Sequence, residues 1–285
     1  MKTALIISSF VSASLVGATT SAFCLRRLGI ESVILPTTLF GRHPGWGQPG
    51  GEITPPALLE DMSQGVLAQN IAFDAVLTGY MGHIDHIDLA CSLIKGLRQQ
   101  NPELTVLVDP VMGDHGKFYI SQDIAQHLKH HLLPLADFIT PNLWEMQFLT
   151  GESVNTLDAI GKAALEKLPC PNIITSLPIM DSIKGEQIGA MLTDRRAHPQ
   201  NVWVKHEKFE KVPNGGGDMI AGLFLAHILN GKTAQNSLSR SVATVFDILS
   251  MTQKNNIAEL PLITHQDALI NAPALKVFKG FNLPK

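Results

Sequence analysis

Val106-Leu-Val-Asp-Pro-Val-Met-Gly-Asp114 joins a short apolar run to a loop that carries two acids. A continuous run of aliphatic and β-branched residues is typical of a strand that is buried on both faces, as in a parallel sheet. Pro110 and Gly113 end this run, so that Asp109 and Asp114 lie in the loop directly after it. The stretch therefore predicts a parallel strand with carboxylates at its carboxyl end.

Similar apolar runs recur on both sides of this stretch and alternate with longer helical patterns. The predicted strands are Ala4–Ile7, Ser32–Leu35, Ala75–Thr78, Thr105–Asp109, Phe138–Ile139, Asn172–Ile174, Gly189–Leu192 and Val202–Lys205. The predicted helices are Val16–Leu28, Pro56–Gln69, Asp88–Gln100, Ser121–His131, Leu143–Leu149, Thr156–Lys167, Asp218–Leu229 and Ala234–Thr252. This alternation predicts an α/β fold in which helices cover both faces of a mostly parallel sheet.

Composition excludes several classes of protein. The 285 residues include 22 basic and 25 acidic side chains, which leaves no basic face for binding the phosphates of nucleic acid. Three cysteines without paired spacing argue against a disulfide framework and predict a cytoplasmic location. No apolar window is long enough for a membrane span. The chain lacks repeats, low-complexity tracts and linkers, so residues 1–285 are expected to form one domain.

Two segments need a separate interpretation. The apolar start from Ala4 to Ala18 has some features of a secretory signal, but four serines interrupt it, and a buried first strand is the favoured interpretation. The segment Pro36 to Pro55 is rich in proline and glycine, and it predicts a long flap or edge hairpin over a site.

The most informative motif is Pro213-Asn-Gly-Gly-Gly-Asp218 at the start of a predicted helix. The backbone N–H groups of Gly215, Gly216 and Gly217 can converge on an anion, because no side chain obstructs them and the helix dipole favours negative charge there. A bound phosphate would repel the carboxylate of Asp218. A role for Asp218 that fits this position is to accept the proton of a hydroxyl that takes up a phosphoryl group.

Oxygen ligands also follow two of the predicted strands. Asp109 and Asp114 come after one strand, and Asn142 and Glu145 after the next. Mg²⁺ prefers such ligands and often needs only one or two carboxylates besides substrate phosphates. The carboxyl ends of parallel strands share one crevice, so these residues and Asp218 together predict a Mg-nucleotide site that faces a base. Taken alone, each acidic segment is equally well explained as a loop with a helix cap.

The combination of motifs resembles the pyridoxal kinase branch of the ribokinase superfamily. The resemblance runs from about Ala4 to Thr252 and rests on Asp109-Pro-Val-Met-Gly-Asp114, Thr140-Pro-Asn-Leu-Trp-Glu145, Ile174-Thr-Ser176 and Gly215-Gly-Gly-Asp218 in this order. It implies a ribokinase-like fold, a homodimer formed near the flap, and ATP-dependent phosphorylation of the 5′-hydroxymethyl group of pyridoxal, pyridoxine or pyridoxamine.

The resemblance also implies roles for individual residues. Asp218 is the expected general base, and Gly215 to Gly217 are the expected anion hole. The residues expected to hold Mg²⁺, directly or through water, are Asp114 and Glu145, and those near a monovalent cation such as K⁺ or Na⁺ are Asp109, Thr140 and Thr175. The nucleotide side is expected to comprise Asp109, Asn142, Glu145, Thr175, Ser176, Asn214, Gly215 and Gly217. The vitamin side is expected to comprise Ser9, His43, Tyr80, Tyr119 and Asp218.

The departures from the family pattern lie mainly on the vitamin side. Phe10 and Ala18 stand where the family has histidine and asparagine, Pro44 replaces the threonine that would touch the vitamin, and Gly216 replaces a threonine or valine of the anion hole. Two alternatives therefore stay open. The first is a kinase for another hydroxymethyl heterocycle, such as a hydroxymethylpyrimidine, and the second is a protein that binds pyridoxal or its phosphate without catalysis.

Overall fold

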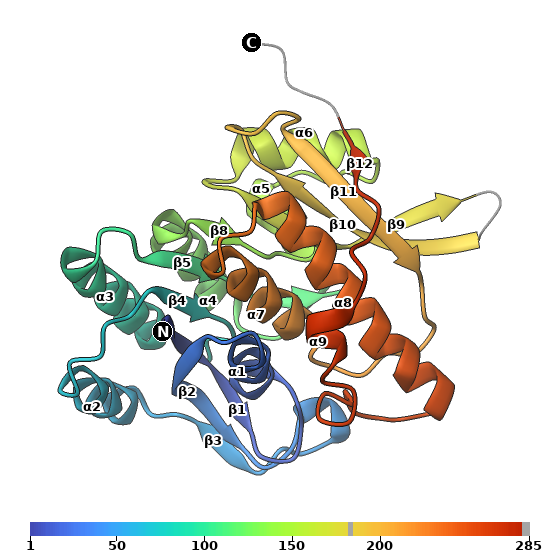
Figure 1. Ribbon diagram of the computed structural model, residues 1–285. Coiled ribbons are helices and arrows are strands. Elements are labelled where there is room, and N and C mark those ends of the chain that lie inside the picture. The colour runs from blue at the N-terminus through green and yellow to red at the C-terminus, as the bar shows by residue number, and fades with distance from the viewer. Residues whose placement is uncertain (182–184, 281–285) are drawn as a thin grey trace.

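The computed structural model describes residues 1–181 and 185–280, and its centre is a ten-stranded sheet (Figure 1). The strands are β1 (Thr3–Val11), β2 (Glu31–Phe40), β3 (Gly51–Ile53), β4 (Ala75–Thr78), β5 (Thr105–Val108), β8 (Phe138–Ile139), β9 (Asn172–Asp181), β10 (Gly185–Thr193), β11 (Asn201–Glu207) and β12 (Phe278–Lys279). Their order in space is β12-β11-β10-β9-β8-β5-β4-β1-β2-β3. Neighbouring strands from β9 to β2 pair in parallel, and antiparallel strands extend the sheet at both edges.

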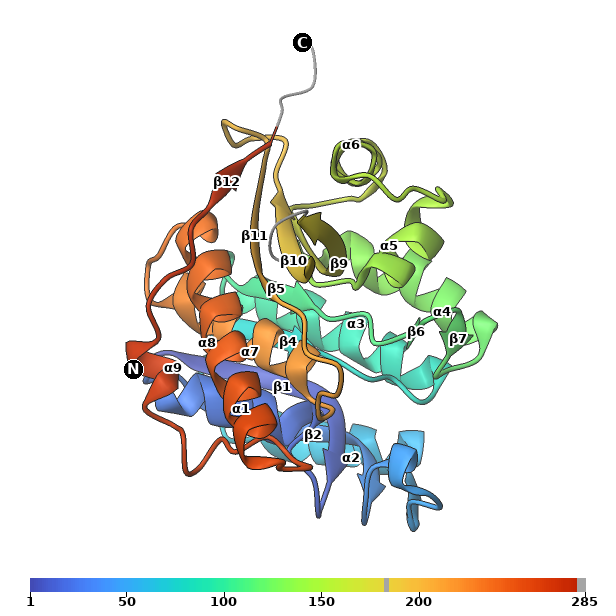
Figure 2. The same cartoon turned by 90° about the vertical axis from the view of Figure 1, so that its right-hand side faces the viewer.

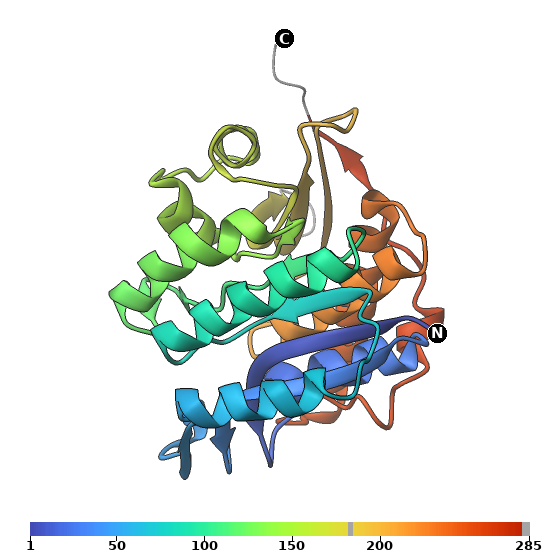
Figure 3. The ribbon, with the colours of Figure 1, turned by 90° about the vertical axis from the view of Figure 1, so that its left-hand side faces the viewer.

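Helices cover both faces of this sheet (Figure 2). They are α1 (Gly17–Arg27), α2 (Pro56–Leu67), α3 (Ile84–Gln100), α4 (Gln122–His127), α5 (Leu143–Thr150), α6 (Leu157–Lys167), α7 (Gly216–Leu229), α8 (Ala234–Asn255) and α9 (Ala268–Asn271). Figure 2 shows α1, α7 and α8 on one side of the sheet and α3, α5 and α6 on the other. Figure 3 shows α2 and α3 running side by side across the second face.

The two faces follow from the alternation of side chains along each strand. In β5, Val106 and Val108 join one buried cluster, whereas Leu107 between them joins the other. The first cluster packs against α3, α5 and α6, and the second packs against α1, α7 and α8. Both sides of the strand are therefore buried, which is why its sequence is apolar without polar alternation.

The structure confirms the predicted α/β fold, and every predicted strand and helix lies on an element. The strand pairs β1–β2 and β9–β10 are longer than the apolar runs that predicted them. The helix predicted at Ser121–His131 is α4 continued by a π-helical turn at Leu128–Leu132. Prediction missed β12, α9 and the small sheet of β6 (Gly113–Asp114) and β7 (Lys117–Phe118), because elements of two to four residues have no readable periodicity.

The segment Pro36 to Pro55 is an edge hairpin, as predicted. Strand β2 continues to Phe40, the chain makes a short 3₁₀ turn at Pro44–Trp46, and β3 returns antiparallel with Thr38 opposite Ile53. The predicted buried first strand is also confirmed, since Ala4 to Ile7 of β1 are almost completely inaccessible to solvent. Within residues 1–181 and 185–280, no helix has both the length and the apolar character needed to cross a membrane.

Candidate active site

Four polar or glycine positions form a row at the carboxyl ends of the parallel strands. Backbone N–H groups of Gly79, Asp109 and Thr140 donate to carbonyl oxygens of the neighbouring strand at 2.9, 2.9 and 3.1 Å, and that of Thr175 donates to Pro141, two residues beyond β8, at 2.9 Å. The ladder thus continues one residue beyond the apolar runs. This pairing holds Asp109 and Thr140, which the sequence placed in one crevice, beside each other at the same edge of the sheet.

The loop before α7 is shaped by Gly215. This residue has a φ of +97°, which side chains rarely tolerate, and an added Cβ would meet the Leu15 carbonyl oxygen and the Leu260 side chain. Helix α7 begins at the next residue, and within the described chain no side chain caps its first turn. An added Cβ at Gly216 or Gly217 would meet nothing within 4 Å, so the N-terminus of α7 is open to a bound group.

Asp218 lies in the first turn of α7 and carries a raised pKa. Burial raises the pKa of its carboxyl from 3.8 to about 6, although hydrogen bonds from the backbone N–H groups of Gly17 and of Asp218 itself oppose the rise. A base with this pKa is mostly ionised at pH 7 and still basic enough to take a proton. The Ser21 hydroxyl donates to the Asp218 carbonyl at 3.2 Å and ties α1 to this turn.

Three carboxylates from distant segments influence one another electrostatically. Burial raises the pKa of Asp109 well above its usual range, the charges of Glu145 and Asp218 raise it further, and the Thr140 hydroxyl opposes the rise. Asp109 is 7% exposed and Glu145 only 3%. Since these acids come from the ends of β5, α5 and α7, the predicted convergence of the three motifs on one crevice agrees with the structure.

Glu145 is held by three backbone groups. Its Oε1 accepts from the N–H groups of Met112 and Gly113 at 2.7 and 3.4 Å, and its Oε2 accepts from Asn142 at 2.9 Å. The Asn142 side chain accepts from the Glu145 N–H in return, which completes a capping box at the start of α5. Burial and the charge of Asp114 nevertheless raise the pKa of Glu145 to about 7. The helix-cap interpretation is therefore correct for Asn142 and Glu145, and it does not exclude a role in the crevice.

The residues predicted to hold cations offer oxygen ligands, but too few of them to complete the coordination of a metal ion without other groups. Among the described residues, no three histidines, cysteines or acids are close enough to form a metal centre of their own. Mg²⁺ needs fewer protein ligands when phosphates complete its shell, and a cation beside Glu145 and Asp114 would relieve the cost of burying charge there. The Thr140 hydroxyl is buried beside Asp109 and lowers the pKa of that carboxyl, so this pair offers oxygen ligands to a monovalent cation.

Of the residues predicted for the vitamin side, Ser9 lies beside the N-terminus of α1 and His43 lies in the flap. An added Cβ at Gly17 would collide with Ser9, so β1 and α1 approach closely at this point. His43 of the flap lies 3.2 Å from the Asn214 side chain, measured from Nδ1 to Nδ2, which joins the flap to the anion-hole loop. The Thr37 hydroxyl donates to the Tyr80 carbonyl oxygen at 2.6 Å. Ser176, which is predicted for the nucleotide side, is exposed and has a φ of +59°.

Two positions that depart from the family pattern, Ala18 and Pro44, differ in their exposure to solvent. Ala18 is completely buried in the cluster that packs against β1 and α7, so its methyl group contributes to the core. Pro44 is exposed at the start of the 3₁₀ turn in the flap. Tyr119 is 57% exposed, and the charges of Asp114 and Glu145 add to the effect of burial in raising its pKa, which places it near the acidic side of the crevice.

Sequence reasoning missed Glu259, which follows α8. Its carboxylate accepts the Ser14 hydroxyl at 3.1 Å and the Leu15 N–H at 3.4 Å. These partners are 245 and 244 residues away in the chain, and Glu259 lies in a segment without a recognisable motif. No local sequence signal could have found this contact.

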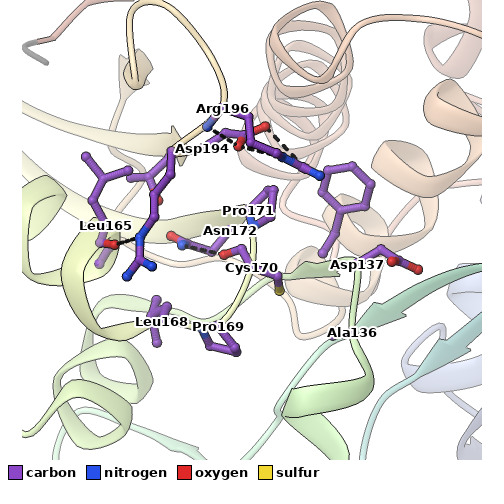
Figure 4. A pocket seen from close by; sticks show the side chains of 14 residues that line it. Ala136, Asp137, Leu165, Leu168, Pro169, Cys170, Pro171, Asn172, Asp194 and Arg196 are labelled. Atoms are coloured by element: carbon purple, nitrogen blue, oxygen red, sulfur yellow. Dashed lines mark hydrogen bonds and ion pairs between the residues drawn. The ribbon is translucent and has the colours of Figure 1, made fainter. Parts of the chain in front are cut away.

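Figure 4 shows a cavity of about 490 Å³ that none of these residues lines. It is lined by Ala136 to Phe138 and Pro171 at the amino ends of β8 and β9, and by Asp194 to Arg196 beyond β10. Figure 4 shows the Arg196 side chain directed toward Asp194, with which it forms an ion pair. None of the predicted site residues lines this cavity, so it is separate from the crevice at the carboxyl ends of the strands.

Comparison with known proteins is consistent with this geometry. Residues 48–260 match the family described as phosphomethylpyrimidine kinase. The pyridoxal kinase PdxY of Corynebacterium diphtheriae is 33% identical over 92% of this chain and 94% of its own, and PdxY of Rubrobacter xylanophilus is 30% identical over 94% and 93%. Pyridoxal kinase from Leishmania donovani in complex with ADP has the same fold, with a TM-score of 0.88, 21% identity and full coverage of both chains. The chain therefore belongs to the pyridoxal kinase family of ribokinase-like proteins.

Proposed function

We propose that the protein transfers the γ-phosphoryl group of ATP to the 5′-hydroxymethyl group of pyridoxal or a related B6 vitamer. The observation that carries the proposal is the position of Asp218, whose pKa is about 6, in the open and uncapped first turn of α7. A carboxylate next to an anion-binding helix terminus fits a base that removes a proton while a phosphoryl group is bound. The family relationship supports the same reaction.

In the proposed reaction, proton removal and phosphoryl transfer occur in a single step. Asp218 accepts the proton of the substrate hydroxyl as the hydroxyl oxygen forms a bond to the γ-phosphorus, and the bond between that phosphorus and the β–γ bridging oxygen breaks to release ADP. The backbone N–H groups of Gly215, Gly216 and Gly217 stabilise the charge on the transferred group. Positioning and electrostatic stabilisation thus supply most of the catalysis.

Cations and nucleotide are assigned to the acidic side of the crevice. Asp114 and Glu145 would hold Mg²⁺, directly or through water, and Asp109, Thr140 and Thr175 would hold a monovalent cation. A bound Mg²⁺ neutralises phosphate charge and orients the phosphates. The nucleotide would contact Asn142, Ser176 and Asn214. Because burial and the charge of Asp114 raise the pKa of Glu145 to about 7, a nearby cation would also keep this carboxylate ionised.

The acceptor is assigned to the side of Ser9, His43, Tyr80 and Tyr119. A second candidate acceptor is a hydroxymethylpyrimidine, because residues 48–260 match the phosphomethylpyrimidine kinase family and because Pro44 offers no hydroxyl where the family resemblance implies a threonine. Both acceptors present a primary alcohol on a heterocycle, and therefore use the same base. Comparing kcat/KM for pyridoxal, pyridoxine, pyridoxamine and hydroxymethylpyrimidine distinguishes them.

We further propose that the chain is a single-domain cytoplasmic homodimer that pairs near the flap. Four large apolar side chains are exposed around this edge of the sheet, which are Leu39, Trp46, Ile53 and Leu58, at 40, 51, 39 and 42%. They come from β2, β3, the turn between them and α2. Apolar groups gathered in this way are typical of surfaces that another protein covers.

The test of the kinase assignment is Asp218→Asn. ADP production that depends on added vitamin should fall by about 10²-fold or more, because the general base is lost, while ATP binding is retained. Asp158→Asn is the matched control, since Asp158 is an exposed acid in the first turn of α6 and its loss removes only a favourable interaction with a helix dipole. Equal turnover of the two variants would refute the role of Asp218. Tight pyridoxal binding without any ADP production in the unmodified protein would favour the non-catalytic alternative.

A further inference from the structure

The chain segment after α8 returns to the active site. Asn256 caps the end of α8 in a left-handed conformation, and the Ile257 N–H donates to the Thr252 carbonyl oxygen at 3.0 Å. Leu260 is 2% exposed and packs in a cluster with Met219 and Leu223 of α7. Residues 257–260 are thereby anchored beside the first turn of α7, and Glu259 points to the loop between β1 and α1.

Glu259 holds the middle of that loop, residues 12–16. Its two carboxylate oxygens accept from the Ser14 hydroxyl at 3.1 Å and from the Leu15 backbone N–H at 3.4 Å. Ser14 is 8% exposed, so its hydroxyl depends on this partner in place of water. Backbone hydrogen bonds connect the start of the loop to the flap. The Ser12 N–H donates to the Phe40 carbonyl oxygen at 2.8 Å, and the Ala13 N–H donates to the Gly41 carbonyl oxygen at 3.0 Å.

The same loop contacts both parts of the proposed catalytic machinery. The Leu15 carbonyl oxygen occupies the space that a Cβ of Gly215 would need, so it packs against the anion-hole loop. Two residues later, the Gly17 N–H donates to the Asp218 carboxylate. A displacement of Ser14 and Leu15 would therefore change the contacts of Gly215 and the hydrogen bond to the base together.

We propose that Glu259 is a positioning residue for phosphoryl transfer, which acts by holding Ser14 and Leu15 so that Gly17 keeps its hydrogen bond to Asp218. The proposal rests on the proposed function, because it gives Asp218 the role of base. The hydrogen bonds that Glu259 makes in the described chain go to Ser14 and Leu15. Its influence passes through the loop that it holds, and the loop links the C-terminal segment, the flap and the base.

The proposal predicts a change in the protonation of Asp218. A hydrogen bond to the charged carboxylate lowers its pKa, so weakening the Gly17 bond should raise that pKa above about 6. The charge of Asp218 also raises the pKa values of Asp109 and Cys24. In the described chain, neither of these residues forms a hydrogen bond with Glu259. On the flap, the charge of Glu259 also opposes the lowering of the His43 pKa by burial.

The test is the titration of Asp218 in the ligand-free protein, followed by carbon-13 NMR of its carboxyl and assigned with Asp218→Asn. Glu259→Ala should raise the pKa of Asp218 by about half a unit or more, and Glu259→Gln, which keeps one acceptor, by less. Asp267→Asn is the matched control. It removes another carboxylate of the C-terminal segment, which pairs with Arg27 of α1 at 2.9 Å and, among the described residues, has no hydrogen bond or ion pair with the loop.

The same variants are then compared for turnover with Mg-ATP and pyridoxal. Glu259→Ala should lower kcat by about tenfold and shift the acid limb of the pH profile upward, whereas Asp267→Asn should do neither. An unchanged Asp218 pKa in Glu259→Ala, or an equal change in Asp267→Asn, would overturn the proposal. If Glu259→Ala does not fold, Ser14→Ala removes the partner hydroxyl and should shift the pKa in the same direction. Absence of turnover in the unmodified protein would refute the kinase assignment alone, because the NMR titration does not depend on activity.

Discussion

Replacing Gly215 by alanine should damage the site far more than replacing Gly216. Gly215 has a φ of +97°, and its added Cβ would lie 2.8 Å from the Leu260 Cδ1 and in contact with the Leu15 carbonyl oxygen. An unfavourable backbone conformation costs about 1–3 kcal/mol, and overpacking costs about 1–3 kcal/mol more. Gly215→Ala should therefore lower the free energy of unfolding by about 2–6 kcal/mol.

Gly216→Ala is the matched comparison, because it makes the same chemical change one residue later. The backbone of Gly216 is helical, and its added Cβ would meet no atom within 4 Å. Alanine also favours a helix more than glycine does, so the free energy of unfolding should change by less than about 1 kcal/mol and can increase.

Urea unfolding of both variants, with linear extrapolation to water, measures the difference. Turnover of Gly215→Ala should also fall, because relief of the collision with Leu15 displaces the loop that carries the Gly17 N–H. A Gly215→Ala variant as stable as Gly216→Ala would show that the Leu15 and Leu260 contacts do not restrict this position, and would refute the reasoning.

Two further predictions concern Asp218, and a third concerns the exposed apolar side chains at the flap. Turnover with Mg-ATP should rise as pH increases through about 6, where Asp218 loses its proton, and a pH profile without an acid limb near this value would contradict the assignment of the base. Asp218→Asn should raise the free energy of unfolding at pH 7 by up to about 3 kcal/mol, because the folded state raises the pKa of Asp218 and its charged form therefore opposes folding. This cost is fully present above about pH 6, so the gain over the unmodified protein should shrink when unfolding is measured near pH 4. Trp46→Lys should convert a dimer into a monomer in sedimentation equilibrium, and a monomeric unmodified protein would refute the proposed pairing at the flap.

Most of the fold could be predicted because the information is local. Val106, Leu107 and Val108 are apolar because both faces of β5 are covered, and that pattern is visible in the sequence without knowledge of what covers them. The glycine and proline content of residues 36–55 likewise predicted the edge hairpin. Strands β6 and β7 could not be predicted, since two residues each have no period and their pairing depends on the surrounding loop.

Some residues of the candidate site could likewise be predicted from the sequence, whereas their interactions could not. Asp109, Glu145 and Asp218 could be selected from the sequence, because acids after apolar strands and glycines before a helix have a recognisable chemistry. Their electrostatic coupling could be expected only from the rule that the carboxyl ends of parallel strands share a crevice, and the raised pKa of Asp109 agrees with that expectation. Ala18 illustrates the limit, since it was noted only as a departure from the family pattern, and the structure shows that its side chain is buried in the core.

The sequence alone thus determined the α/β class, the order of the elements and the types of residue that carry the chemistry. Tertiary structure decided which distant residues support them, such as His43 with Asn214 and Glu259 with Ser14. The physical reason is that strand and helix patterns arise from burial and backbone hydrogen bonds within short stretches. A contact between residues 245 positions apart depends on the packing of the whole chain, and leaves no periodic trace in either segment.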